Sequence, residues 1–256
     1  MSNSALASDP MWQNGAAAVS EVALSQDSSI TGQTAQRSSV LAAVIAGIGL
    51  ALVAIRVLHL VGAPVATDDL WWHLRLGEEY TAHGPWLESD PLLYTAVEGA
   101  PPPHAWLFGV AVSAVDRSLG LHGLRVVHVA IVVFIIGLAY SVFRREAGGR
   151  APAFLATIVF LVLTADRLPR LRPDLFSIPA ALLLYLLLLE GDEPPSWRRV
   201  AASVLLVLVW ANFHAAFAVG PLFLVAALFG LAVRFGLRRF EDARGRGLPE
   251  SGGASA

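Results

Sequence analysis

The residues best suited to chemistry gather in the stretch from Thr67 to Gly84, which reads TDDLWWHLRLGEEYTAHG. It opens with two neighbouring carboxylates, Asp68 and Asp69. A carboxylate can accept the proton of a hydroxyl group as a general base, or it can bind a hard divalent cation. Asp is also among the preferred residues at helix N-termini, so a purely structural role for this pair is the alternative. We expect Asp68 or Asp69 to be the catalytic acid-base residue.

Two residues of this stretch have the spacing of a metal-ligand pair. His73 follows Asp69 by four residues, and the 3.6-residue repeat puts both side chains on one face if 69–81 is helical. The pair is compatible with one Mg²⁺ or Mn²⁺ ion, and no other cofactor is expected. Two ligands are a weak signal, and an ordinary surface pair is the alternative.

A second chemical group lies in the segment DRLPRLRPD, from Asp166 to Asp174. Arg167, Arg170 and Arg172 can clamp a phosphate, because a guanidinium offers a planar fork of donors. The alternative is that they bind lipid headgroups at the membrane surface.

A third group is the segment WANFHA, which interrupts an apolar run and contains His214. Polar groups at membrane depth are costly and often functional, although this turn can also lie at the surface. Together with residues of the first polar loop, these groups give the candidate substrate-binding set. Its members are His73, Arg75, Asp90, His104, Arg167, Arg170, Arg172 and His214.

The composition places the chain among membrane proteins. It is 55% hydrophobic and 15% charged, with a mean hydropathy of +0.61, whereas soluble domains average about 25% charged residues. It has no cysteine, which excludes disulfides and thiolate metal sites. The net charge of −2 gives no reason to expect a nucleic-acid partner.

Apolar runs predict an all-α, polytopic transmembrane bundle of about six spans. The expected spans are 40–61, 121–143, 152–165, 174–189, 199–213 and 215–235. Residues 105–115 are too short to cross upright, so they are expected to form an interfacial helix in the first outer loop, as is 69–81. We divide the chain into a disordered tail (1–38), a transmembrane domain (39–236) and a second disordered tail (237–256).

Arginine positions give the orientation. Basic residues favour the cytoplasmic side, and the clusters at 144–150, 198–199 and 234–239 all fall there if the N-terminus is cytoplasmic. The same topology puts the loop with Asp69, the segment 166–174 and the WANFHA turn together on the outer side. The three arginines of 166–174 break the rule, as an anion-binding site would, and the alternative is an ordinary exception in a short loop.

These blocks carry a family resemblance. The sequence DDLWWHLRLGEEYTAHGPWLESDPLLYT, followed by HAWL, RPDLFSIP and WANFHAAFAVG, resembles bacterial polytopic membrane proteins similar to the GT-C glycosyltransferases. That class includes relatives of the dolichyl-phosphate-mannose and lipid A arabinose transferases. The resemblance covers about 40–235 and corresponds to the N-terminal part of such proteins.

The resemblance implies transfer of a sugar from a polyprenyl-phosphate donor to an extracytoplasmic acceptor. The essential outer-loop acid of the class would fall on Asp68 or Asp69, a second outer-loop acid on Asp90, and phosphate binding on the arginines of 166–174. The expected partners are membrane lipid, the lipid-linked donor and a partner membrane subunit, in a bacterial plasma membrane. The alternative is a catalytically inactive or truncated membrane subunit or scaffold of the same fold.

Overall fold

The described part of the chain is helical throughout. The computed structural model describes residues 11–63, 68–93, 102–103, 105–191 and 193–245, and these contain no strand. The helices are α1 (Met11–Val61), α2 (Asp68–His83), α3 (Trp106–Glu146), α4 (Arg150–Leu163), α5 (Asp174–Leu188), α6 (Trp197–Phe213), the short 3-10 helix η1 (Ala215–Ala218) and α7 (Val219–Gly245).

Three helical segments are long and apolar enough to cross a membrane. They are Gln36–Val61, Trp106–Glu146 and Ala215–Leu237. Helices α4 and α5 are apolar but only 14 and 15 residues long, below the roughly 20 residues that an upright span requires. The all-helical fold predicted from the sequence is therefore confirmed, and three of its helices are able to span a membrane, whereas the count of about six spans is not confirmed.

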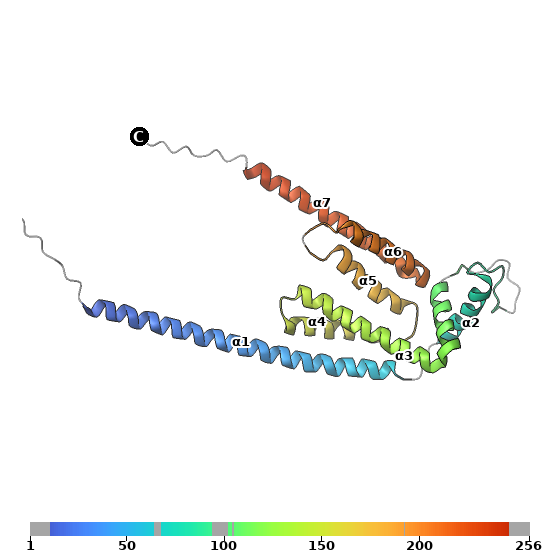
Figure 1. Ribbon diagram of the computed structural model, residues 1–256, viewed down its shortest axis with the longest axis horizontal. Coiled ribbons are helices and arrows are strands. Elements are labelled where there is room, and N and C mark those ends of the chain that lie inside the picture. The colour runs from blue at the N-terminus through green and yellow to red at the C-terminus, as the bar shows by residue number, and fades with distance from the viewer. Residues whose placement is uncertain (1–10, 64–67, 94–101, 104, 192, 246–256) are drawn as a thin grey trace, which may run out of the picture.

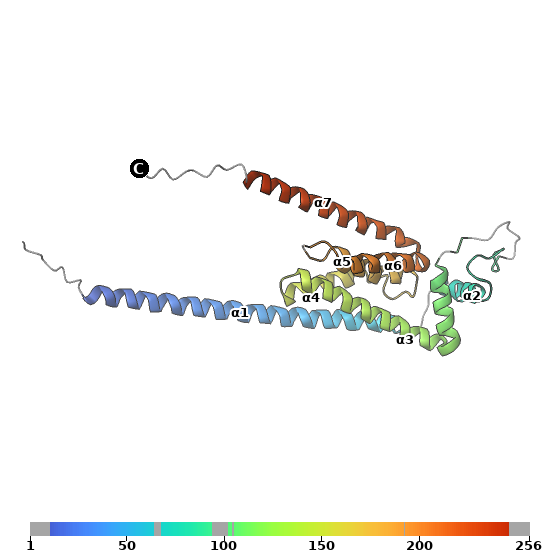
Figure 2. The same ribbon diagram turned by 45° about the horizontal axis from the view of Figure 1, so that its top comes forward.

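The helices form an elongated bundle with α2 at one end (Figure 1). The later part of α3 and helix α4 pack against α1, whereas α5, α6 and α7 pack with one another on the side away from α1 (Figures 1 and 2). Helix α2 packs on the first part of α3. One apolar core joins α1, α3 and α4 and includes Leu70 of α2, and a second joins α5, α6 and α7 around Trp210. The end of the bundle beside α2 is where the chemically active residues converge.

A glycine bends α3 into two arms. Gly120 has φ +66° and ψ −172°, a conformation that residues with a Cβ rarely adopt, and the first arm turns across the end of the bundle there (Figure 1). The sequence predicted a short helix over 105–115 that would end before Asp116 and Arg117. It continues to the glycine because polar residues do not break a helix, and Ser118 bonds back to the Ala114 carbonyl at 2.8 Å.

The ends of the described chain are more helical than the sequence suggested. Helix α1 reaches back to Met11 and α7 extends to Gly245, where disordered tails were expected for 1–38 and 237–256. The first of these segments is rich in alanine, the strongest helix former, which accounts for a helix where polarity suggested none.

Backbones meet where α2 packs on α3. A Cβ added to Gly77 would lie 2.0 Å from the Gly109 carbonyl oxygen, and a Cβ on Gly109 would lie 3.0 Å from the His73 carbonyl oxygen. Small residues are what permit two helices to approach this closely. The contact fixes the face of α2 that carries Asp69 and His73.

Gly77→Ala is expected to destabilise the protein by about 1–3 kcal/mol, because the new methyl group meets rigid backbone rather than a movable side chain. The measurement is thermal unfolding of the purified chain in detergent, followed by circular dichroism and tryptophan fluorescence. Gly137→Ala is the matched control, since a Cβ there meets nothing within 4 Å and helix propensity predicts a gain of about 0.5–1 kcal/mol. Equal melting temperatures for the two variants would contradict the close contact.

Candidate functional site

Three separate parts of the chain supply the polar residues around one cavity at the α2 end of the bundle. Its volume is about 410 Å³, and it lies between α2, the segment leading into α5, and the turn from α6 to η1. The residues that line it are Asp69, His73, Ala105, Arg167, Arg172, Pro173, Asp174, His214 and Ala215. Five of these belong to the sets predicted from the sequence, so predicted residues far apart in the chain meet at one cavity.

An ion pair joins the first outer segment to the arginine segment. Arg172 Nη2 lies 3.0 Å from Asp69 Oδ2, and the two side chains are 33% and 52% exposed. The Arg172 Nε atom is buried and has no hydrogen-bond partner among the described residues. Buried donors are almost always paired in folded proteins, so the unpaired Nε is an exception among the described residues.

His73 lies beside this ion pair as a neutral ring. Its imidazole packs edge-on against Phe108, with the ring centroids 4.9 Å apart. Burial lowers the pKa of His73, Arg172 and His214 lower it further, and Asp69 opposes them. His73 is therefore uncharged near neutral pH and presents one donor and one acceptor nitrogen.

The second acid and second arginine of the cavity also pair with each other. Arg167 Nη1 lies 3.1 Å from Asp174 Oδ2 and Arg167 Nε lies 3.7 Å from Asp166 Oδ2. Burial of Leu168 and Leu171 holds this segment against the bundle. His128 of α3 adds to the hold, because its Nε2 donates to the Leu168 carbonyl oxygen at 2.8 Å. The arginine segment is thus anchored by apolar residues between its charges.

A hydrogen-bonded network fixes the third wall of the cavity. His214 has extended backbone between α6 and η1, and its Nδ1 lies 2.8 Å from Ser177 Oγ. The buried Trp210 indole N–H donates to the same Ser177 oxygen at 2.8 Å. Burial lowers the pKa of His214, with Asp174 raising it and Arg167 lowering it.

Sequence reasoning missed Ser177 and Trp210. Ser177 lies one turn after Asp174 in an otherwise apolar helix, and a lone polar residue in such a helix was the available signal. Trp210 opens the WANFHA segment, but only His214 of that segment was predicted to belong to the site. A further link joins Trp106 Nε1 to Asn212 Oδ1 at 2.8 Å, which ties the start of α3 to the end of α6.

The donor set does not fit a divalent metal. No group of three or more His, Asp or Glu side chains is arranged to hold one within the described ranges. Asp69 and Asp174, the carboxylates of the cavity, each face a guanidinium instead. Asp69 and His73 do line one cavity, but the Asp69 carboxylate already pairs with Arg172.

Other predicted site residues lie apart from the cavity. Arg75 pairs with Glu78 at 2.8 Å and with Glu79 at 2.7 Å on the exposed side of α2. Asp90 accepts a hydrogen bond from the Leu92 N–H at 2.8 Å, which is a local turn contact. Arg170 is exposed and does not line the cavity. His104 and the side chain of Asp68 lie outside the described residues.

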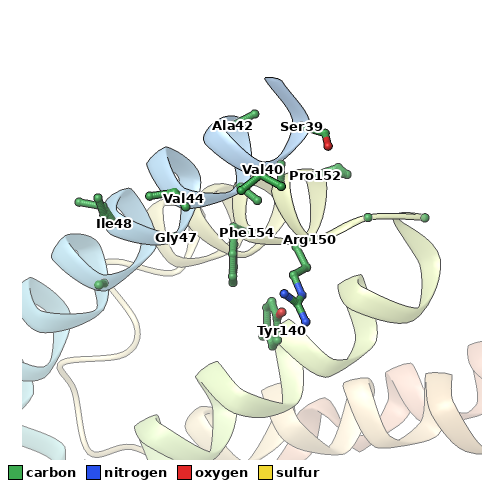
Figure 3. Close-up of a pocket in the computed structure, with 15 residues that line it drawn as sticks. Ser39, Val40, Ala42, Val44, Gly47, Ile48, Tyr140, Arg150, Pro152 and Phe154 are labelled. Carbon is green, nitrogen blue, oxygen red and sulfur yellow. The ribbon is translucent and has the colours of Figure 1, made fainter. Parts of the chain in front are cut away.

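A larger cavity lies toward the opposite end of the bundle, between α1, α3 and α4 (Figure 3). Its volume is about 1170 Å³, and its walls are mainly aliphatic and aromatic, with Val44 and Phe154 among them. Arg150 extends toward Tyr140 there, and none of the described residues that line it is acidic (Figure 3). It offers space for apolar chains and lacks the paired charges of the cavity at α2.

Comparisons with known proteins give no match to any family model, to any curated protein or to any solved structure. The function is therefore argued from the geometry of the cavity.

A cross-linking experiment tests this geometry, because the chain has no native cysteine. Asp69→Cys combined with Arg172→Cys is expected to cross-link with a short bifunctional thiol reagent, since the two native side chains are in contact. Mass spectrometry of the joined peptides measures the yield. Glu78→Cys with Arg172→Cys is the control, because Glu78 lies outside the cavity and pairs with Arg75. Equal yields from both pairs would contradict the arrangement.

Proposed function

We propose that this chain is a membrane glycosyltransferase of the GT-C kind, which transfers a sugar from a polyprenyl phosphate to an acceptor hydroxyl on the outer side of a bacterial plasma membrane. The observation that carries the proposal is that Asp69, Arg167 and Arg172 line one cavity. A carboxylate and two guanidinium groups are the groups that an acceptor hydroxyl and a phosphate leaving group require. In this reading the N-terminus is cytoplasmic, and α4, α5 and α6 complete a six-span bundle.

The phosphate would bind Arg172 in exchange for Asp69. Asp69 lies 3.0 Å from the Nη2 atom of Arg172, so the incoming phosphate competes with this carboxylate for the guanidinium group. Two phosphate oxygens can then bind the guanidinium in the bidentate manner typical of arginine. Arg167 lies on the same cavity and adds a second positive charge.

The reaction is then a direct displacement at the anomeric carbon. The acceptor oxygen forms the new C–O bond while its proton passes to the Asp69 carboxylate. The bond between the anomeric carbon and the phosphate oxygen breaks, and its electron pair leaves with the polyprenyl phosphate, whose charge Arg167 and Arg172 stabilise. A single displacement of this kind inverts the anomeric centre.

The surfaces of the outer helices suit lipid or a partner subunit. The most apolar windows of Gln36–Val61 and Ala215–Leu237 are only 11% buried, which leaves most of their side chains for the bilayer or another helix. This observation also supports the alternative function, a catalytically inactive membrane subunit or scaffold that uses these helices to assemble with a partner.

Asp69→Asn is expected to lower the transfer rate by about 10²- to 10⁴-fold, the usual cost of losing a general base. Membranes containing the chain are incubated with radiolabelled polyprenyl-phosphate sugars, and product is measured at equal protein levels. Glu78→Gln is the matched control, because it removes a carboxylate from the same helix outside the cavity. Asp68→Asn distinguishes the two neighbouring acids. Absence of transfer by the well-expressed native chain with several donors would favour the scaffold.

Arg172→Gln is expected to raise the KM for the lipid-linked donor about tenfold or more, since it removes a charge-assisted contact to phosphate. Steady-state kinetics with the same donor provide the measurement. Arg117→Gln serves as the control, because Arg117 is an exposed arginine of α3 that does not line the cavity. A KM equal to that of the native chain would remove Arg172 from the binding role.

A further inference from the structure

Ser177 has two polar partners and an unusual bonding pattern for a helical serine. The buried helical residues Ser203 and Thr157 each donate their hydroxyl to the backbone carbonyl four residues earlier. Ser177 makes no such bond among the described residues; its hydroxyl faces Trp210 and His214 instead. The hydroxyl therefore joins two side chains rather than satisfying its own helix.

The direction of these two bonds follows from their donors. An indole nitrogen can only donate, so the Trp210 N–H gives its proton to Ser177 Oγ. The Ser177 proton then needs an acceptor, and His214 Nδ1 at 2.8 Å is the acceptor within reach among the described residues. If His214 donated from Nδ1 instead, the serine hydroxyl would hold two incoming protons and leave its own unpaired. His214 Nδ1 is thus the unprotonated nitrogen.

This assignment leaves the proton of a neutral His214 on Nε2. The ring has no Nε2 partner among the described residues, and His214 forms part of the cavity wall with Arg167 and Asp174. Trp210 supports His214 in two ways. Its indole N–H bonds Ser177, which contacts the His214 ring, and its carbonyl oxygen accepts the His214 backbone N–H at 2.9 Å. Trp210 is 1% exposed, so this support is rigid.

We propose that Trp210 and Ser177 are positioning residues that lock His214 as the Nε2–H tautomer, which makes His214 a neutral hydrogen-bond donor to an isoprenyl phosphate in the cavity. A neutral donor adds a hydrogen bond to the phosphate without adding charge to a cavity that already contains two acid–arginine pairs. The identity of the ligand rests on the proposed function, whereas the tautomer does not.

Nuclear magnetic resonance of the full chain in lipid nanodiscs, with ¹⁵N-labelled histidine, tests the tautomer. Protonated and unprotonated ring nitrogens have well-separated shifts, and His214→Gln identifies the His214 signals. Native protein at neutral pH is expected to show only the Nε2–H form. Ser177→Ala is expected to give a mixture of tautomers, Ser177→Thr to restore the single form, and Ser203→Ala, a buried serine outside the network, to change nothing. The Nδ1–H form in the native chain overturns the proposal whether or not the variants fold.

Titration with farnesyl phosphate tests the donor role. Its binding is expected to shift the His214 Nε2 signal in the native chain, and Ser177→Ala is expected to raise the dissociation constant about threefold to tenfold, the cost of one weakened hydrogen bond. Binding that leaves the Nε2 signal unmoved overturns the donor role. Sugar transfer is measured separately, so its absence would count against the proposed function while the tautomer and phosphate results still decide this inference.

Discussion

The cavity depends on the close backbone contact between Gly77 of α2 and Gly109 of α3. Without side chains at these positions, α2 can lie directly on the first arm of α3, and Gly109 also meets the His73 carbonyl. That contact sets the rotation of α2, so that Asp69 and His73 face the arginine segment while Arg75, on another face, pairs with Glu78 and Glu79. A rotated α2 would exchange these two sets of charges.

The other two walls are rigid for different reasons. Apolar burial anchors the arginine segment, because Leu168 and Leu171 alternate with its charges and point into the core. Hydrogen bonds anchor the His214 turn, because a break between α6 and η1 leaves polar groups that Ser177 and Trp210 satisfy. Each wall therefore holds its polar groups in fixed positions, which is what preorganised binding requires.

The sequence was informative where the type of a residue alone decides the environment in which it lies. Long apolar runs predicted membrane helices, and the positions of Asp69, Arg167, Arg172 and His214 predicted polar groups that the structure brings to one cavity. Which charged side chains pair with one another could not be predicted in the same way. Whether an arginine faces a ligand or a glutamate depends on helix rotation, so Arg75 and Arg172 looked equivalent in the sequence. Ser177 gained its role only through contact with residues more than 30 positions away.

The charge balance of the cavity constrains how it can work. Two acids face two arginines, and both histidines are held neutral by burial, so the described lining has no excess charge to attract an anion. Under the proposed function, a phosphate would therefore bind Arg172 in competition with Asp69. In the proposed reaction this competition has a direct consequence. The step that binds the leaving group also loosens Asp69 from its guanidinium partner, so the carboxylate is released to accept the acceptor's proton when the donor is in place.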